Sequence, residues 1–200
     1  MKNTFGFVVV SGGLTGILSF SCLALAIGTE YWYIIEDKRA NNADPARSNY
    51  GLWGVTDDVQ SYTEDTGYSE SERQMKIMHK VIAILLPLSL VMLVFGGICG
   101  LVSSLARSRT LLIGSASYFL LCSLLTLSGL SLYIRFSQKA LEEAVRRMGR
   151  EQMAQVYTSY GWSMGMAWIS FLLEVITGLL LLLAARLVPL TQYEESVAPI

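Results

Sequence analysis

The chain has 200 residues, of which 52% are hydrophobic and only 16% are charged, and its formal net charge is −1. Average globular chains carry roughly 25% charged residues, so this composition argues against an ordinary soluble domain. The near-neutral charge gives no indication of nucleic-acid binding and shows no acidic tail.

Four stretches of the chain are long and apolar enough to cross a lipid bilayer. The hydrocarbon core takes about 20 helical residues, and we predict spans at residues 5–29, 81–106, 110–134 and 160–186. The first apolar stretch exceeds the roughly 7–15 residues of a signal-peptide core, so we expect it to be retained as a helix. The spans predict an all-α membrane protein with four transmembrane helices.

The first connection, residues 30–80, contains patterns that are typical of folded structure. The aromatic and β-branched run Tyr31–Ile35 predicts a strand that leaves the membrane, and Trp32 also suits the aromatic belt at a membrane surface. A second strand is predicted at Tyr50–Val55, after a turn or mobile link at residues 41–49. We therefore expect a small β-structure outside the membrane.

The other two connections differ sharply in length. Only Arg107, Ser108 and Arg109 separate the second and third spans, which predicts a tight helical hairpin. In the second segment outside the membrane, residues 135–159, apolar residues recur at helical spacing as far as Met148. We expect the third helix to continue past the membrane surface; an amphipathic helix lying on the lipid is the alternative.

An even number of spans places both ends of the chain on the same side of the membrane. The ends and the short connection hold Lys2, Arg107, Arg109 and Arg186, and the opposite side holds the other eleven of the 15 Lys and Arg residues. A raw count under the positive-inside rule opposes cytoplasmic ends, but charges in long loops count for little. Charge counting does not settle the topology; we favour cytoplasmic ends, with a tail at 187–200.

Glu174 is the only charged residue in the core of the fourth predicted span. A carboxylate in the middle of a bilayer is costly, so we expect Glu174 to be protonated or bonded to a hydroxyl such as Ser19, Ser21 or Thr126. A proton or ion path is the alternative. Such a path normally needs a relay, and no second acid, His or Lys lies at membrane depth.

Small residues recur at four-residue spacing in three of the predicted spans. The pairs are Gly12 with Gly16, Gly96 with Gly100, and Gly161 with Gly165. Small side chains let helices approach closely in a membrane. We expect these glycines to pack the helices of one chain together; a dimer face is the alternative.

The residues that carry most enzyme and cofactor chemistry are scarce. The three cysteines, Cys22, Cys99 and Cys122, lie in apolar stretches where we expect them to be buried, and no Cys-x-x-Cys pair is present. The single histidine, His79, stands beside Lys80 at the start of a predicted span. We therefore predict no catalytic, cofactor-binding or metal site, and a protein that is not an enzyme.

Several short motifs, in their order along the chain, resemble the superfamily of claudins, peripheral myelin protein and calcium-channel gamma subunits. The motifs are Tyr31-Trp32-Tyr33, Gly51-Leu52-Trp53 and Tyr160-Gly161-Trp162-Ser163. The stretches 27–36, 85–101 and 161–178 are similar to the branch of the superfamily formed by transmembrane proteins 114 and 235.

The resemblance implies a four-helix claudin-like bundle with a small extracellular β-sheet, cytoplasmic termini and a place in the plasma membrane. It implies that Trp32 and Trp53 pack the sheet against the membrane end of the bundle. In one respect the chain departs from the family, because the cysteine expected after the Gly-Leu-Trp motif is Thr56 here. The loop would then depend on aromatic packing, without the disulfide that a rigid sealing loop needs.

These features predict a protein that works by contacts with other membrane proteins. The structural or interaction candidates are Trp32, Gly51, Leu52, Trp53, Trp162 and Glu174. The first hypothesis is an auxiliary subunit of a channel or receptor, the second is a cell-junction or adhesion component, and the third is a transporter that uses Glu174. The C-terminal residues Val197–Ile200 also give a weak indication of a PDZ ligand.

Overall fold

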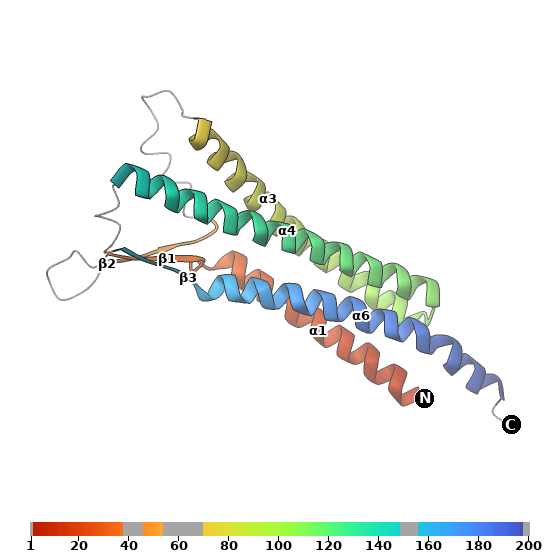
Figure 1. Ribbon diagram of the computed structural model, residues 1–200. Helices are drawn as coiled ribbons and strands as arrows, with labels where there is room; N and C mark the ends of the chain where they lie inside the picture. The colour runs from red at the N-terminus through yellow and green to blue at the C-terminus, as the bar shows by residue number, and fades with distance from the viewer. Residues whose placement is uncertain (1, 38–45, 54–69, 149–155, 198–200) are drawn as a thin grey trace. The chain divides into compact units, whose positions relative to one another are not determined.

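The structure is a computed structural model that describes residues 2–37, 46–53, 70–148 and 156–197. Within these ranges the chain forms four long helices and three short strands (Figure 1). The helices are α1 (Lys2–Gly28), α3 (Glu70–Leu105), α4 (Arg109–Met148) and α6 (Trp162–Val197). The strands are β1 (Tyr33–Asp37), β2 (Ala46–Tyr50) and β3 (Val156–Tyr160).

Each of the four helices contains a segment that is long and apolar enough to cross a membrane. These segments are Thr4–Gly28, Arg73–Leu105, Arg109–Glu143 and Trp162–Val188. In hydrocarbon a helix satisfies every backbone hydrogen bond within its own segment, which explains why uninterrupted apolar runs fold in this way. The prediction of four spanning helices is therefore confirmed.

Three helices extend well beyond the predicted spans, and one of them, α6, runs to Val197, eleven residues past the predicted end at residue 186. Helix α4 runs without a break to Met148, which confirms that the third helix continues as one element. Helix α3 begins at Glu70, eleven residues before the predicted start at Val81. Its added turns are rich in Glu, Arg, Gln, Met and Lys, which are good helix formers, so local propensity extends the helix where the apolar pattern has already ended.

By their contacts, the residues divide into two compact units. Unit 1 comprises Met1–Leu23, Leu88–Leu127 and Ile169–Ile200. Unit 2 comprises Ala24–Pro87 and Ser128–Trp168.

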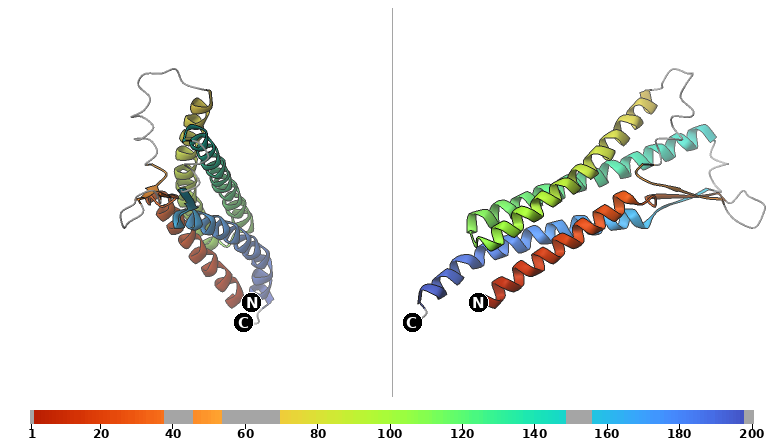
Figure 2. Two further views of the ribbon diagram at one scale, coloured as in Figure 1. Left: turned by 60° about the vertical axis from the view of Figure 1, so that its left-hand side comes forward. Right: turned by 180° about the vertical axis from the view of Figure 1, so that it is seen from behind.

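Unit 1 contains the start of α1, the end of α6 and the hairpin between α3 and α4. Figure 2 shows the start of α1 and the end of α6 close together from two further directions. The hairpin is as tight as predicted: Arg107 has a φ of 46°, and the Leu112 N–H donates to the Ser108 carbonyl at 3.0 Å. A single left-handed residue is a common way to end one helix before another begins.

The core of unit 1 is built largely from small and aliphatic side chains. Leu112, Ala116, Cys122 and Ala184 are all fully buried. Cys99 differs, because it is exposed on α3, so the expectation that all three cysteines are buried is wrong for this one. A sulfhydryl is apolar enough to face lipid, and the hydrophobicity of its surroundings in sequence does not distinguish a lipid-facing position from a core position.

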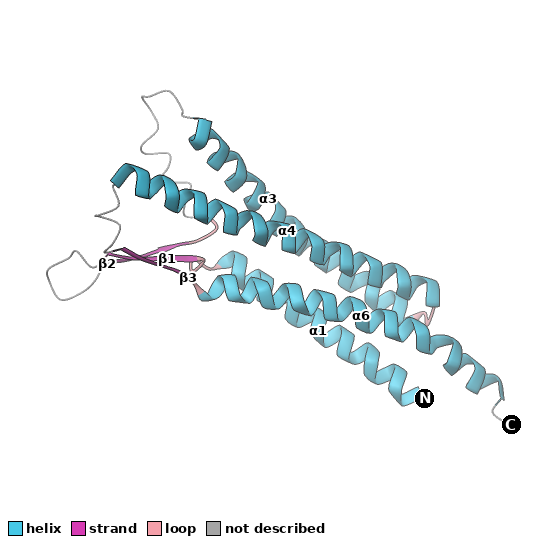
Figure 3. Cartoon of the chain, in the orientation of Figure 1, coloured by secondary structure: helices cyan, strands magenta, loops and turns pink. Residues whose placement is uncertain are grey.

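Unit 2 contains a three-stranded antiparallel sheet with the order β2-β1-β3 (Figure 3). Strand β1 lies in the centre, and Tyr33 at its start is opposite both Tyr50 of β2 and Tyr160 of β3. The rings of Tyr33 and Tyr160 are in edge-on contact, with centroids 5.9 Å apart. Cross-strand aromatic pairs of this kind stabilise a sheet.

The second strand lies earlier in the chain than the sequence predicts. Strand β2 ends at Tyr50, so the predicted strand Tyr50–Val55 is wrong over residues 51–53, while residues 54 and 55 lie outside the described residues. Residues 46–49, predicted as part of a turn or link, belong to β2 instead. The reason is that Gly51 must approach the backbone of Glu30 closely, which turns the chain away from the sheet after Tyr50.

The third strand is an element that the sequence reading missed. Val156–Tyr160 pairs with β1 along its whole length, and α6 begins at Trp162, so Tyr160 belongs to the sheet and not to the fourth span. The run Val-Tyr-Thr-Ser-Tyr has the β-branched and aromatic composition of a strand and would have supported this prediction.

Candidate functional site

Two glycines of unit 2 contact the passage that leads from α1 into β1. A Cβ atom on Gly161 would overlap the carbonyl group of Tyr31, and one on Gly51 would lie 2.7 Å from the Cα of Glu30. The Gly161 N–H donates to the Trp32 carbonyl at 3.0 Å. Both positions therefore require glycine because the backbones pass too close for any side chain.

Trp32 fills the space next to this passage. Its side chain is fully buried, and its indole N–H donates to the Ala26 carbonyl at 2.6 Å. Its ring packs on Tyr133 of α4, with centroids 4.7 Å apart. A large aromatic side chain with its one polar group satisfied contributes strongly to a core, and Trp32 belongs to the core of unit 2.

Trp53 and its neighbours connect the Gly-Leu-Trp motif to two helices of unit 2. The Trp53 indole N–H donates to the Ile27 carbonyl at 3.0 Å, yet 51% of the side chain is exposed. Leu52 is fully buried, and its carbonyl lies 3.0 Å from Nε2 of His79. The two tryptophans thus differ in burial: both indole groups donate to carbonyls of α1, but Trp32 is fully buried and Trp53 is half exposed.

Trp162 begins α6 and is also about half exposed. Its ring lies against that of Tyr31, with centroids 5.9 Å apart. Thr29 and Ser163 share a hydrogen bond of 2.7 Å beside this pair. Exposed aromatic side chains at the ends of apolar helices are typical of the membrane–water interface, and in unit 2 they gather around the passage from α1 to β1.

Glu174 is the fully buried carboxylate of unit 1. The Thr126 hydroxyl of α4 lies 3.0 Å from both of its oxygens, and the Ser170 hydroxyl lies 3.4 Å from one of them. Of the three hydroxyls considered from sequence, Thr126 is in direct contact, whereas Ser21 bonds to the Ile17 carbonyl within its own helix.

Ser19, the third hydroxyl considered from sequence, belongs to a reciprocal pair with Ser170. The Ser19 hydroxyl donates toward the Ser170 carbonyl at 3.1 Å, and the Ser170 hydroxyl donates toward the Ser19 carbonyl at 2.8 Å. Through Ser170, the polar contacts of Glu174 reach α1 as well as α4. Ser170 was missed from sequence, although its position four residues before Glu174 on one helix predicts that the two side chains are neighbours.

The described residues do not meet the requirements of a metal site. In the ranges that the structure places, no group of three or more His, Cys, Asp or Glu side chains could hold a metal ion. The partners of Glu174 are hydroxyl groups, which can hold a buried carboxyl group in place without any metal.

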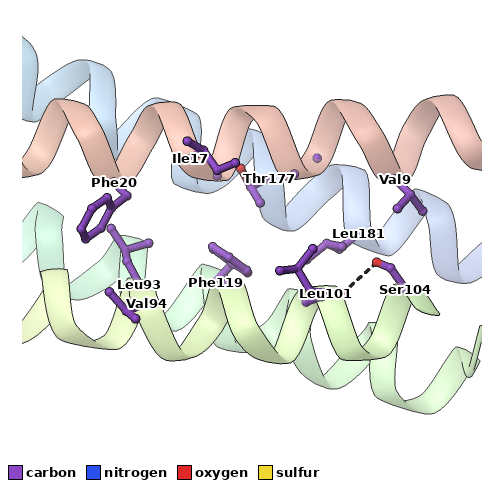
Figure 4. Close-up of a pocket in the computed structure, with 15 residues that line it drawn as sticks. Val9, Ile17, Phe20, Leu93, Val94, Leu101, Ser104, Phe119, Thr177 and Leu181 are labelled. Atoms are coloured by element: carbon purple, nitrogen blue, oxygen red, sulfur yellow. Dashed lines mark hydrogen bonds between the residues drawn. The ribbon is translucent and has the colours of Figure 1, made fainter. Parts of the chain in front are cut away.

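Glycines of α1 and α3 line a groove in unit 1 (Figure 4). The groove has a volume of about 410 Å³. Within the predicted glycine pairs, a Cβ on Gly12 or Gly16 would touch α6, and one on Gly96 would touch Tyr118 and Phe119 of α4. These glycines therefore pack helices of the same chain together, while Gly13 and Gly97 have open space above them.

One face of α6 in unit 1 carries large exposed apolar side chains at regular spacing. The stripe consists of Ile169, Leu172, Ile176, Leu179 and Leu183. Alternating steps of three and four residues keep side chains on one face of a helix. This stripe, called the α6 stripe below, faces either lipid or another protein in a membrane.

Comparison with known proteins places this arrangement in a family. The family model for PMP-22/EMP/MP20/Claudin tight-junction proteins matches residues 17–183. The chain belongs to this family. Four spanning helices and membership of a claudin-type family together make it a multi-pass, four-span membrane protein.

The similar relatives include calcium-channel subunits from several mammals. The voltage-dependent calcium channel gamma-3 subunits of Rattus norvegicus, Mus musculus and Homo sapiens are each 28% identical over 182 residues. The alignments cover 80% of this chain and 55% of each relative. The claudin-family chain thus spans about half the length of the curated relatives it matches, and the branch of transmembrane proteins 114 and 235 stays a prediction.

Proposed function

We propose that this claudin-family protein is a non-enzymatic auxiliary subunit that binds a channel or receptor within the plasma membrane. The observation that carries the proposal is the similarity to voltage-dependent calcium channel gamma-3 subunits over 80% of the chain. The polar groups around the buried Glu174 are hydroxyls that also join the helices to one another. Their structural use supports a protein that acts through contacts and not through catalysis.

Two surfaces are suited to contact a partner. In unit 1 the α6 stripe presents branched and aliphatic side chains along one helix face, the arrangement by which one helix packs against another. In unit 2, exposed aromatic side chains such as Trp53, Tyr160 and Trp162 surround the passage into the sheet. Tyrosine and tryptophan are enriched in protein interfaces because they bury a large area at low entropic cost.

We further propose that both termini are cytoplasmic and that the sheet of unit 2 is extracellular. The short hairpin between α3 and α4 then lies in the cytoplasm, where Arg107 and Arg109 agree with the positive-inside rule. Epitope tags at the N-terminus, at the C-terminus and in residues 54–69, detected with and without permeabilisation of the cells, test this arrangement directly. Detection of the terminal tag on intact cells would contradict it.

The proposed partnership can be tested by affinity purification from native membranes after brief surface crosslinking. We expect a channel or receptor pore subunit to dominate the captured proteins. The variant Leu172→Ala/Leu179→Ala interrupts the α6 stripe and should weaken capture, whereas Phe7→Ala/Leu14→Ala removes apolar side chains of α1 that are even more exposed and should not. Equal capture by both variants would contradict a partner on α6.

A cell-junction component is the second candidate, because the matching family includes claudins of tight junctions. In the same purification it would appear as recovery of the protein itself, other claudin-like proteins and scaffold proteins, which would overturn the auxiliary proposal. The weak PDZ prediction stays open, because residues 198–200 of its Val197–Ile200 segment lie outside the described residues.

A further inference from the structure

The groove of unit 1 runs lengthwise between α1 and α3. Val9 and Ser104 lie near one of its ends, and Phe20 and Leu93 lie near the other (Figure 4). Eleven residue steps separate Val9 from Phe20, so the groove extends along about 16 Å of helix.

The size of the groove favours one kind of apolar occupant. A helix is about 10 Å across, and the groove volume of about 410 Å³ matches less than one helical turn, so a partner helix would reach into the groove only with its side chains. A single hydrocarbon chain, whose carbons contact their neighbours at about 4 Å, is narrow enough to lie along the groove.

The walls of the groove are apolar, and the few polar groups among the lining residues are already hydrogen-bonded within the protein. The two hydroxyl side chains among the lining residues, Ser104 and Thr177, donate to carbonyls of their own helices, Gly100 at 2.8 Å and Leu173 at 2.8 Å. Their donors are therefore satisfied without a ligand, so an occupant of the groove needs no polar groups. An acyl chain, which is as apolar as a leucine side chain, meets this condition.

Positive charge stands at one end of the groove. Arg107 follows the lining residue Ser104 by three positions, Arg109 lies just beyond it, and both side chains are exposed. Basic side chains next to a membrane surface attract anionic lipid headgroups. We propose that unit 1 binds one phospholipid with an anionic headgroup, placing an acyl chain in the groove and the headgroup beside Arg107 and Arg109.

The open glycines of the groove allow a test that leaves the packing of the chain intact. A Cβ on Gly13 or Gly97 would meet no atom within 4 Å, so Gly13→Leu/Gly97→Leu starts each new side chain in open space and occupies part of the groove. Gly114→Leu on α4 is the matched control, because its Cβ is equally unobstructed and Gly114 does not line the groove. Equal thermal stability in detergent verifies that both variants fold.

The probe is phosphatidylglycerol with a photoreactive diazirine in one acyl chain, and labelled peptides are mapped by mass spectrometry in nanodiscs. We expect adducts concentrated on lining residues such as Phe20 and Leu101. We expect Gly13→Leu/Gly97→Leu to reduce them by about ten-fold and Gly114→Leu to leave them unchanged. With Arg107→Gln or Arg109→Gln, the preference over phosphatidylcholine should fall by about five-fold for each arginine removed.

Three results would overturn the proposal. Labelling spread evenly over the exposed apolar side chains of the helices would show ordinary contact with bulk lipid. Unchanged labelling in Gly13→Leu/Gly97→Leu would show that the groove holds no acyl chain. Loss of a protein partner or of self-association in that variant, with labelling retained, would assign the groove to a protein contact. Because the lipid experiment uses purified protein, its result is separate from the partner test of the proposed function.

Discussion

Gly161 is the residue on which the local packing of unit 2 depends most directly. Its missing side chain lets the start of α6 approach Tyr31, and its N–H pairs with the Trp32 carbonyl. Gly161 itself precedes α6, and Gly165, four residues later and within that helix, has open space instead. Two glycines that look like one packing motif in the sequence therefore have different physical roles, because only Gly161 is required for close contact.

Alanine substitution distinguishes these two roles. We expect Gly161→Ala to destabilise the protein by about 3 kcal/mol, the upper part of the usual range for overpacking. Gly165→Ala should stabilise it by about 0.5–1 kcal/mol, because alanine loses less backbone freedom in a helix. Denaturant unfolding in micelles measures both. Equal effects of the two substitutions would show that the approach of Gly161 to Tyr31 does not limit this site.

Substitution of Glu174 tests whether its charge or its hydrogen bonds stabilise the protein. Glu174→Gln keeps an oxygen that can accept from Thr126, so we expect a change in stability within about 1 kcal/mol. Glu174→Ala loses the contacts and leaves a cavity, and should cost about 2–3 kcal/mol. If Gln were as damaging as Ala, the negative charge itself would be required.

The same glutamine variant addresses transport as an alternative function. A proton or ion path through Glu174 requires that Glu174→Gln abolish flux in reconstituted vesicles while expression is unchanged. We expect no difference between this variant and the unaltered protein, because the Thr126 hydroxyl holds Glu174 in place.

Helices α1 and α6 are joined by the reciprocal bonds of Ser19 and Ser170. We expect a double-mutant cycle with Ser19→Ala and Ser170→Ala to give a coupling free energy of about 0.6–1.7 kcal/mol, the range measured between membrane helices. Ser21→Ala is the control, because Ser21 bonds within α1. Additive effects of Ser19→Ala and Ser170→Ala would mean that the reciprocal pair is not a stabilising contact.

The helices could be predicted from sequence because length and apolarity alone decide which segments cross a membrane. Strand β1 was predicted from its aromatic and β-branched run, but the position of β2 was not. That position depends on the approach of Gly51 to Glu30, a contact between distant residues that no local pattern contains. Strand β3 could have been predicted from the composition of Val156–Tyr160. It was missed because its last residue was assigned to the fourth predicted span.

The candidate surfaces show a similar division. A buried partner for Glu174 could be predicted, because an acid at membrane depth must be satisfied. The groove could not be predicted, because the glycines of α1 and α3 that line it are far apart in the chain. The sequence also does not show which glycines are covered by a neighbouring helix. Gly12 and Gly13 are adjacent in sequence, yet only Gly12 contacts α6.

The molecule as a whole combines a claudin-family architecture with exposed apolar helix faces. Four spans, a sheet centred on β1 and the match over residues 17–183 establish the architecture. The α6 stripe and the aromatic side chains of unit 2 are the surfaces on which our account of function rests. If the protein is an auxiliary subunit, a partner must contact α6 in the native membrane.

Site-specific photocrosslinking in cells tests this requirement most directly. A photoreactive amino acid is placed at Leu172 or Leu179 on the α6 stripe, and at Phe7 or Leu14 of α1 as matched exposed controls. We predict that the α6 positions, and not the α1 positions, crosslink to one channel or receptor subunit. Equal crosslinking to many membrane proteins from all four positions, or to other copies of this chain alone, would contradict the account.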